Sequence, residues 1–351
     1  MHKPLSTALG LLALPQPYLL FLGDTTEAAY AKTAFGLRDW APKLCVGEFV
    51  CKGGTVTTGL PFLRPAQAYA EGARGLVIGV ANPGGFIPNA WIAALVEALQ
   101  AGLHIVSGMH TSLEDMPMLK AAAARYGRNL LDVRRPPANI PIASGRKRSG
   151  KRLLTVGTDC ALGKKYTALA LARAFAARGI QADFRATGQT GILISGRGIP
   201  IDAVVGDFAA GAAEMLSPDA DDDHWDVIEG QGSLLHPAYA GVSLALLHGS
   251  QPDAVVICHE PGRERILGHP GYLVPSVEET IDLTLRLGRR TNAAIRCAGV
   301  SLNTAQLDAK AAKRLIDEQS QRLGLAVADP MRGGDTFERL VDACLAEGKL
   351  Q

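Results

Sequence analysis

The sequence reads Leu153-Leu154-Thr155-Val156-Gly157-Thr158-Asp159-Cys160-Ala161-Leu162-Gly163-Lys164-Lys165-Tyr166-Thr167 at the point that decides its fold. An apolar run ends in a glycine-rich turn, a lysine follows the second glycine, and a helical pattern begins at Thr167. The backbone N–H groups of such a loop converge at a helix N-terminus, where the helix dipole favours an anion. The order of strand, loop and helix predicts a phosphate-binding loop.

Lys165 distinguishes this loop from most phosphate-binding loops. A Ser or Thr normally follows the loop lysine and ligates Mg²⁺, whereas Lys165 follows Lys164 here. The loop therefore predicts a phosphorylated ligand that is bound without being split. The residues assigned to this site are Gly157, Thr158, Asp159, Cys160, Ala161, Gly163, Lys164, Lys165, Tyr166 and Thr167.

Strand-like runs alternate with helical patterns along the chain, which favours an α/β fold with two doubly wound parallel sheets. The runs of the first half are Leu19–Leu22, Cys45–Val50, Gly75–Val80, His104–Val106 and Asn129–Val133. Those of the second half are Leu153–Val156, Ala182–Arg185, Asp226–Ile228, Ala254–Cys258, Ala294–Val300 and Leu325–Ala328. We expect a Rossmann-like domain over 1–140, a basic linker over 141–151 and a P-loop NTPase-like domain over 152–351.

Two sequence features limit what these domains bind. No G-x-G-x-x-G follows the first strand, so a nicotinamide cofactor is not expected in the first half. The basic run 146–152 could contact phosphates, but a charge run of this length is more often a solvated linker, and we interpret it so.

Composition narrows the class of protein. The net charge of +2 gives no electrostatic case for a nucleic-acid or membrane partner. The six cysteines form no C-x-x-C pair, and we interpret them as reduced thiols of a cytoplasmic protein. The apolar run Leu5–Leu14 lacks a convincing cleavage site, so it is not interpreted as a signal peptide. His259-Glu260 does not complete H-E-x-x-H, and no metal site is predicted.

Three loops follow predicted strands of the second half, where ligands of a parallel sheet bind: residues 185–191 leading to 195–198, residues 229–237 and residues 259–265. Each contains glycine, which lets a ligand approach the backbone closely. Glu229, His236 and Asp207 are the candidates for proton transfer; each could instead be structural, as a loop cap, a satisfied histidine or a paired acid. The residues assigned to substrate binding are Gln189, Thr190, Arg197, Gln231, Ser233 and Arg263.

The combined pattern resembles the DgcN family of D-glutamate N-acetyltransferases. The resemblance rests on Leu20-Phe21-Leu22-Gly23-Asp24, Ala31-Lys32-Thr33-Ala34-Phe35-Gly36-Leu37, Val156-Gly157-Thr158-Asp159-Cys160-Ala161-Leu162-Gly163-Lys164, Thr187-Gly188-Gln189-Thr190-Gly191 and Glu229-Gly230-Gln231-Gly232-Ser233-Leu234-Leu235-His236-Pro237. It implies a Rossmann-like domain joined to a P-loop domain similar to dethiobiotin synthetase. The implied activity is acetyl transfer from acetyl-CoA to the amino group of D-glutamate, in D-amino-acid catabolism.

Two other functions stay open on the sequence. The loop also resembles that of dethiobiotin synthetase, so an ATP-dependent ligase or kinase that uses ATP and Mg²⁺ is the first alternative. A non-catalytic nucleotide sensor is the second. In either acyltransferase or ligase we expect a small-molecule amino-acid substrate, and we expect a homo-oligomer because two-domain α/β enzymes often assemble through leftover apolar faces.

Overall fold

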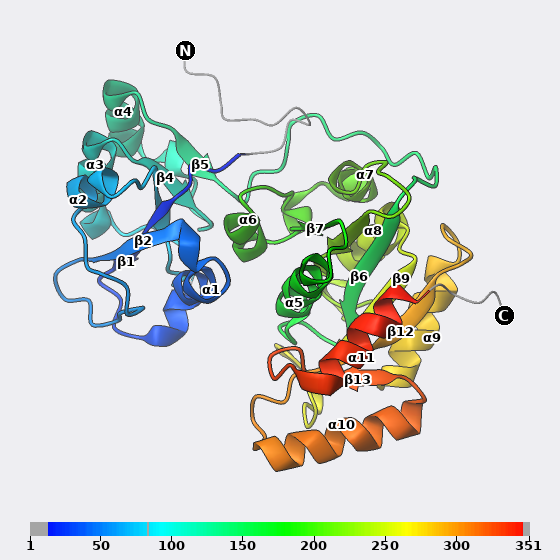
Figure 1. Cartoon of the computed structure of the whole chain (residues 1–351). Coiled ribbons are helices and arrows are strands. Elements are labelled where there is room, and N and C mark those ends of the chain that lie inside the picture. The colour runs from blue at the N-terminus through cyan, green and yellow to red at the C-terminus, as the bar shows by residue number, and fades with distance from the viewer. Residues whose placement is uncertain (1–12, 83, 347–351) are drawn as a thin grey trace. The chain divides into compact units, whose positions relative to one another are not determined.

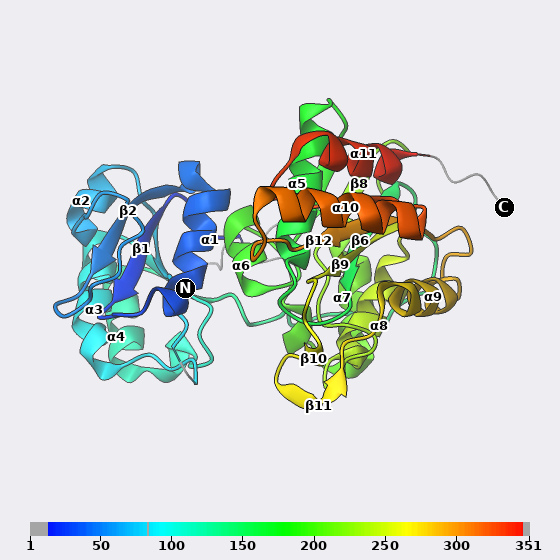
Figure 2. The same ribbon diagram turned by 90° about the horizontal axis from the view of Figure 1, so that it is seen from below.

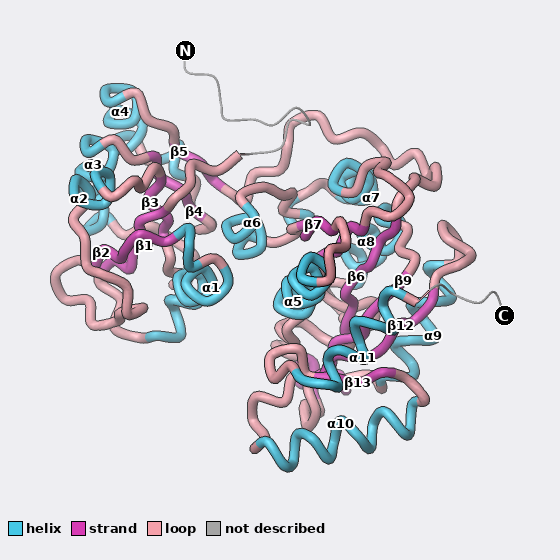
Figure 3. Tube along the Cα trace, in the orientation of Figure 1, coloured by secondary structure: helices cyan, strands magenta, loops and turns pink. Residues whose placement is uncertain are grey.

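The computed structural model describes residues 13–82 and 84–346, which fold into two compact units (Figure 1). The N-terminal unit comprises residues 13–137 together with 189–203. The P-loop unit comprises residues 138–188 and 204–346. The chain therefore passes from one unit to the other three times. Each unit has a sheet with helices packed on it (Figure 3).

The N-terminal unit is built on a five-stranded sheet whose neighbouring strands all pair in parallel, in the order β2-β1-β3-β4-β5. The strands are β1 Tyr18–Gly23, β2 Cys45–Val50, β3 Gly75–Ile78, β4 His104–Ser107 and β5 Leu130–Asp132. The α-helices are α1 Lys32–Trp40, α2 Pro65–Ala70, α3 Ile92–Ala101, α4 Pro117–Tyr126 and α6 Gln189–Ser195. Short 3₁₀ helices are η1 Ala28–Ala31, η2 Pro42–Leu44, η3 Asn89–Trp91, η4 Leu113–Asp115 and η5 Ile201–Ala203.

The central position of β1 follows from its composition. All six of its residues are buried, as expected for a strand covered on both faces in a parallel sheet. The Trp91 ring meets the Phe21 ring edge-on at a centroid distance of 5.3 Å and closes one side of the core. Helices α3 and α4 end at Gly102 and Gly127, which adopt the left-handed conformation that stops a helix.

The P-loop unit is built on a six-stranded parallel sheet in the order β13-β12-β9-β6-β8-β7. Its strands are β6 Lys151–Gly157, β7 Ala182–Arg185, β8 Trp225–Ile228, β9 Ala254–His259, β12 Arg296–Leu302 and β13 Ala326–Ala328. Its helices are α5 Lys164–Ala177, α7 Gly206–Leu216, α8 Ala240–Ser250, α9 Val277–Gly288, α10 Ala309–Leu323 and α11 Gly334–Leu345. An antiparallel hairpin, β10 Arg265–Ile266 with β11 His269–Leu273, projects from this unit (Figure 2).

Strand β6 lies between β8 and β9 in this sheet, so its carboxyl end has a strand end on either side. Helices α5 and α11 contact each other, as do α8 and α9. Ligands of doubly wound sheets bind beyond the carboxyl ends of the strands, at the point where the strand order reverses. The position of β6 thus places the glycine-rich loop at such a point.

Helix α6 joins the N-terminal unit although it follows the P-loop in the sequence. The sequence predicts a loop here, at the end of a strand. The segment instead forms a helix in which Gly191–Ile194 are all buried. The helix packs against α1, and the Tyr18 hydroxyl donates a hydrogen bond to the carbonyl of Leu193 at 3.1 Å. Packing against α1 removes this short apolar run from water, which explains why residues 189–203 belong to the N-terminal unit and not to the P-loop unit.

The interpretation of the basic run 146–152 as solvated was wrong for two of its arginines. Arg148 and Arg152 are buried. Arg148 donates to the carbonyls of Ser217 and Gly249, both at 2.7 Å, and Arg152 donates to the carbonyls of residues 148–150, 217 and 218. Backbone carbonyls, which leave no pattern of charged partners in the sequence, hold this segment on the P-loop unit.

The remaining general expectations can be compared briefly. All six cysteines are free, as predicted. Within residues 13–82 and 84–346 no helix has the length and apolar character that a membrane span needs. The apolar run Leu5–Leu14 lies largely outside the described residues.

Candidate functional site

Residues 158–163 form the glycine-rich phosphate loop, which joins β6 directly to α5. Gly157 ends the strand, and Gly163 adopts φ 103° immediately before the helix begins at Lys164. No side chain caps this helix start by a hydrogen bond, so the N–H groups of the first turn of α5 are left for another acceptor. A 14-residue helix that starts in this way favours an anion at its N-terminus.

Lys164 lies inside the loop and is buried. Its ammonium donates a hydrogen bond to the carbonyl of Asp159 at 2.7 Å. Burial lowers the pKa of Lys164, an effect partly opposed by nearby Cys258, Cys160 and Asp159. The lysine thus places a positive charge within the curve of the loop, as the sequence pattern predicts.

The carboxylate of Asp159 fastens the loop to the segment that leads into the hairpin. Its Oδ1 accepts from the backbone N–H of Cys160 at 2.6 Å, and its Oδ2 accepts from the N–H of Leu267 at 2.9 Å. Arg263 donates from Nη1 to Oδ2 at 3.1 Å and to the carbonyl of Cys160 at 2.7 Å. Its Nη2 pairs with Glu260. The guanidinium of Arg263 therefore holds the phosphate loop, and its Nη1 is engaged there rather than left for a substrate carboxylate.

Glu229 follows β8 directly and is buried beside the phosphate loop. Its Oε2 accepts from the backbone N–H groups of Thr187 at 3.0 Å and Gly188 at 3.1 Å, while Oε1 takes no part in these bonds. Gln231 donates to the Thr187 hydroxyl at 3.0 Å and supports that turn. Burial raises the pKa of Glu229, and the charge of Lys165 opposes the rise. The result is a fixed carboxylate with an elevated affinity for a proton.

Lys165 brings a second positive charge to the site. Its ammonium lies 4.4 Å from the centroid of the Tyr166 ring, a distance typical of a cation–π contact. Burial lowers the pKa of Lys165, and the carboxylate of Glu229 counteracts this. A charged ammonium thus stands at the sequence position where most such loops carry the Mg²⁺ ligand.

The other loop residues serve its shape. The hydroxyl of Thr158 lies 3.0 Å from Nδ1 of His259, and that of Thr167 lies 2.8 Å from the hydroxyl of Ser301. Ala161 is exposed and has φ 55°, which is rare for a residue other than glycine. These contacts fix both ends of the loop and leave its tip open to solvent.

His236 is fully buried against the loop. Its Nδ1 accepts hydrogen bonds from the backbone N–H groups of Ala238 at 3.1 Å and Tyr239 at 3.3 Å. Its Nε2 lies 3.8 Å from Oδ1 of Asp159, beyond hydrogen-bond distance, and has no partner among the described residues. Burial lowers the pKa of His236.

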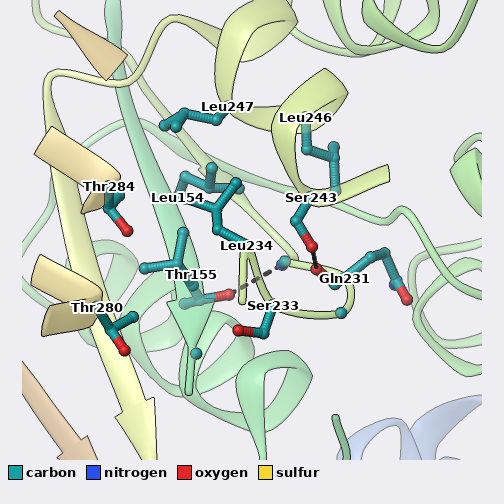
Figure 4. A pocket seen from close by; sticks show the side chains of 14 residues that line it. Leu154, Thr155, Gln231, Ser233, Leu234, Ser243, Leu246, Leu247, Thr280 and Thr284 are labelled. Atoms are coloured by element: carbon teal, nitrogen blue, oxygen red, sulfur yellow. Dashed lines mark hydrogen bonds between the residues drawn. The ribbon is translucent and has the colours of Figure 1, made fainter. Parts of the chain in front are cut away.

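A small internal cavity lies behind the turn that follows Glu229 (Figure 4). Ser233 and Thr284 line it, and Ser233 accepts a hydrogen bond from the N–H of Leu235 at 3.2 Å. The cavity offers about 10 Å³ to the centre of a water molecule, room for about one water and too little for a substrate. Ser233 is thus placed in the wall of the turn.

Gly230 sets the distance between this turn and β6. A Cβ at this position would lie 1.7 Å from the carbonyl oxygen of Thr155. The N–H of Gly230 donates to the Thr155 hydroxyl at 3.0 Å, as Figure 4 shows. The close approach requires glycine and keeps Glu229 beside the phosphate loop.

Replacing Gly230 with Ala is expected to lower the free energy of unfolding by about 3 kcal/mol or more, because the added methyl group overlaps a backbone atom that cannot move alone. Thermal unfolding measures the change. Gly241→Ala in α8 is the matched control, since a Cβ there meets no atom within 4 Å. Equal melting temperatures for the two variants would contradict the argument.

Four of the predicted residues belong to helices α6 and α7 or to the segment after α6. Gln189 and Thr190 form the first turn of α6 in the N-terminal unit, and Arg197 is exposed shortly after it. Asp207 is exposed in the first turn of α7, where the helix dipole favours a carboxylate. Its place at a helix start accounts for an acidic residue within this apolar stretch.

Two groups of metal-ligand side chains occur in the described part of the chain. One is Asp159 with Cys160 and His236, and the other is Asp183 with His224 and Asp226. In the second group, Arg185 lies 2.6 Å from Asp226 and 3.0 Å from Asp183 and already balances both carboxylates. In the first, Arg263 and two backbone N–H groups already engage Asp159.

Sequence reasoning missed the backbone donors that hold Glu229 and the residues of the hairpin. The N–H groups of Thr187 and Gly188 carry no side-chain signal, and Leu267 contributes only its N–H. The sequence indicated the motif Thr187-Gly188 because of its glycine. It did not indicate that Glu229, 42 residues after Thr187, accepts from this backbone. The two strands of the β10–β11 hairpin contain only seven residues and have no alternating apolar pattern.

Comparison with known proteins agrees with this architecture. A family model described as "Domain of unknown function (DUF1611_C) P-loop domain" matches residues 141–341, and one described as "Domain of unknown function (DUF1611_N) Rossmann-like domain" matches residues 47–136. A crystal structure of a DUF1611 family protein from Anabaena variabilis is similar, with a TM-score of 0.80 and 36% identity. The similarity extends over 94% of this chain and 98% of the Anabaena chain.

Two relatives carry functional names. A D-glutamate N-acetyltransferase from Tritonibacter scottomollicae is 52% identical over 330 residues, which are 94% of this chain and 98% of that protein. A D-glutamate N-acetyltransferase from a Pseudoalteromonas species is 47% identical over 323 residues, 92% of this chain and 97% of that protein. Because both domain models match, this chain belongs to the DUF1611 family, with the Rossmann-like domain first and the P-loop domain after it.

Proposed function

We infer that this chain is an enzyme, an N-acetyltransferase that places an acetyl group on the amino group of D-glutamate. Two relatives of that name, at 52% and 47% identity over nearly the whole chain, support the inference. The structural observation that carries it is a phosphate loop with Lys165 in place of the metal ligand, next to the buried carboxylate of Glu229. Neither of these two relatives is named as a ligase, a kinase or a sensor.

Acetyl-CoA is proposed as the acetyl donor. It carries a pyrophosphate and a 3′-phosphate that acetyl transfer leaves intact, which suits a loop without the Mg²⁺ ligand. The uncapped N-terminus of α5 and the ammonium groups of Lys164 and Lys165 supply the donors and the positive charge for phosphate oxygens.

Glu229 is proposed as the general base. The ammonium of D-glutamate cannot attack a carbonyl until it loses a proton, and the free Oε1 of Glu229 can accept that proton. The amine nitrogen then bonds to the thioester carbonyl carbon, the C–S bond breaks, and the sulfur leaves with the electron pair and takes up a proton. The products are N-acetyl-D-glutamate and coenzyme A with its free thiol.

Purified protein tests this function by release of free thiol from acetyl-CoA with D-glutamate, L-glutamate or no amino acid. We expect thiol release that requires D-glutamate and continues in the presence of EDTA, because Lys165 replaces the metal ligand. Phosphate release from ATP with Mg²⁺ is measured in parallel. ATP turnover without thiol release would overturn the proposal in favour of an ATP-dependent enzyme.

We further propose a catabolic role in the cytoplasm, with the protein acting as a homo-oligomer. Six free thiols, one of them Cys160 in the phosphate loop, suit a reducing compartment.

A further inference from the structure

The imidazole of His236 is locked in one protonation form by its backbone contacts. Two N–H groups, of Ala238 and Tyr239, point at Nδ1. An Nδ1 that accepts two hydrogen bonds cannot hold a proton, so the neutral ring carries its only proton on Nε2. His236 therefore presents an N–H donor, and no lone pair, to the phosphate loop.

This form excludes two roles that a histidine beside an aspartate and a cysteine would otherwise suggest. A general base at Nε2 would need an unprotonated nitrogen there. A metal ligand at Nε2 would need the same, with the proton moved to Nδ1. Although a ring nitrogen of His236 lies within 4.8 Å of both Asp159 and the Cys160 thiol, the backbone donors oppose both roles.

The Nε2–H is a buried donor without a partner among the described residues. Such groups are rare in folded proteins, because an unmade buried hydrogen bond is costly. Asp159 does not satisfy it, since the 3.8 Å separation exceeds hydrogen-bond distance and the carboxylate is already held by Arg263 and two N–H groups. An oxygen atom brought by a ligand would satisfy it.

The groups around the ring favour its neutral form. Burial opposes a positive charge on the ring most, and His269 on β11 and Lys164 on α5 oppose it as well. Asp159 on the phosphate loop and the backbone of Leu267 in the hairpin favour a proton on the ring. The rings of His269 and Tyr239 lie against the imidazole at centroid distances of 5.0 and 4.6 Å. The pKa of His236 is therefore lowered, so the ring takes up a second proton at a lower pH than an ordinary histidine does.

We propose that His236 donates its Nε2–H to a phosphate oxygen of the ligand held by the phosphate loop. The donor faces Asp159 and Cys160, within the loop itself, and so lies at the phosphate end of a bound coenzyme. This assignment rests on the proposed function only in naming coenzyme A as the ligand.

Nuclear magnetic resonance of the protein with ¹⁵N-labelled histidine tests the assignment. The ligand titration uses the wild-type protein, so it does not depend on binding by a variant. The His236 signal is identified by its loss in His236→Gln. We expect a neutral ring protonated at Nε2 above about pH 7, and a shift of that proton on adding coenzyme A or inorganic pyrophosphate. A charged ring, a proton on Nδ1, or no shift with either ligand would overturn it.

Affinity for coenzyme A, measured by calorimetry, gives a second test. His236→Gln keeps an N–H donor and is expected to bind within about threefold of wild type, while His236→Leu loses about ten- to a hundredfold. His248→Leu on α8 is the control, because its Nε2 faces the carbonyl of Leu287. Equal losses for coenzyme A and acetyl-CoA support a phosphate contact, and a loss confined to acetyl-CoA would contradict it.

These binding measurements separate the inference from the proposed activity. Pyrophosphate binding with a shifted His236 signal, but without acetyl transfer to D-glutamate, would refute the activity and leave the donor role standing. Acetyl transfer to D-glutamate, with a His236 signal that does not shift on adding ligand, would refute the donor role and leave the activity standing.

Discussion

Glu229→Gln is expected to lower kcat/KM for D-glutamate acetylation by about 100- to 10,000-fold, the usual loss when a general base is removed. The amide keeps an oxygen that can accept from Thr187 and Gly188, so the turn stays in place. Affinity for coenzyme A should change little. Thiol release at varied D-glutamate and acetyl-CoA concentrations separates the two effects.

Glu214→Gln is the matched control for this substitution. Glu214 also accepts from two backbone N–H groups, those of Ser144 and Gly145, both at 2.9 Å, but it lies on α7 away from the phosphate loop. Its acetylation rate should equal that of wild type. If Glu229→Gln were as active as Glu214→Gln, Glu229 would not be the base.

The pH dependence follows from the raised pKa of Glu229. Activity needs the ionised carboxylate, so the rate should rise with pH through a value above the ordinary glutamate pKa of 4.5. The folded state holds this proton more tightly than the unfolded chain does. Glu229 therefore contributes to stability while protonated, and wild type loses that contribution as the pH rises through the window between the two pKa values, whereas Glu229→Gln does not.

Lys164→Met is expected to weaken coenzyme A binding by about 10- to 150-fold, the range for losing a hydrogen bond to a charged group. The melting temperature should stay equal or rise, because burial lowers the pKa of Lys164 and its charge destabilises the protein without ligand. Calorimetric titration and thermal unfolding give the two quantities.

Lys147→Met provides the comparison. Burial also lowers the pKa of Lys147, whose ammonium contacts Asp253 at 2.9 Å, before the start of β9 and thus at the other end of the sheet. It should leave coenzyme affinity unchanged. A similar loss of affinity in both lysine variants would show that the effect is structural.

The parts of the site that sequence predicts are those encoded locally. The phosphate loop is one continuous strand, turn and helix, and its motif specifies Lys164 within a few residues. Glu229 was found because it follows a buried strand directly. The neighbours of the phosphate loop in sequence are also its neighbours in space, and Glu229 is placed by the end of its own strand, although the N–H groups that hold it come from residues 187 and 188.

The remaining features depend on contacts between distant residues. Arg263 was expected to face the substrate, yet it meets Asp159, 104 residues earlier in the chain. The form of His236 depends on two backbone N–H groups, which every residue except proline has. Side-chain patterns carry no record of either arrangement.

Helix α6 has a consequence for dividing this protein into parts. A fragment that starts after residue 137 would carry residues 189–203 without α1, against which the apolar run Gly191–Ile194 is buried. Water would then meet that run, and the fragment would tend to self-associate. The chain returns to α6 one residue after Gly188, whose N–H holds Glu229. The P-loop unit is therefore not a portable module, because cutting the chain at residue 137 separates α6 from the helix that covers it.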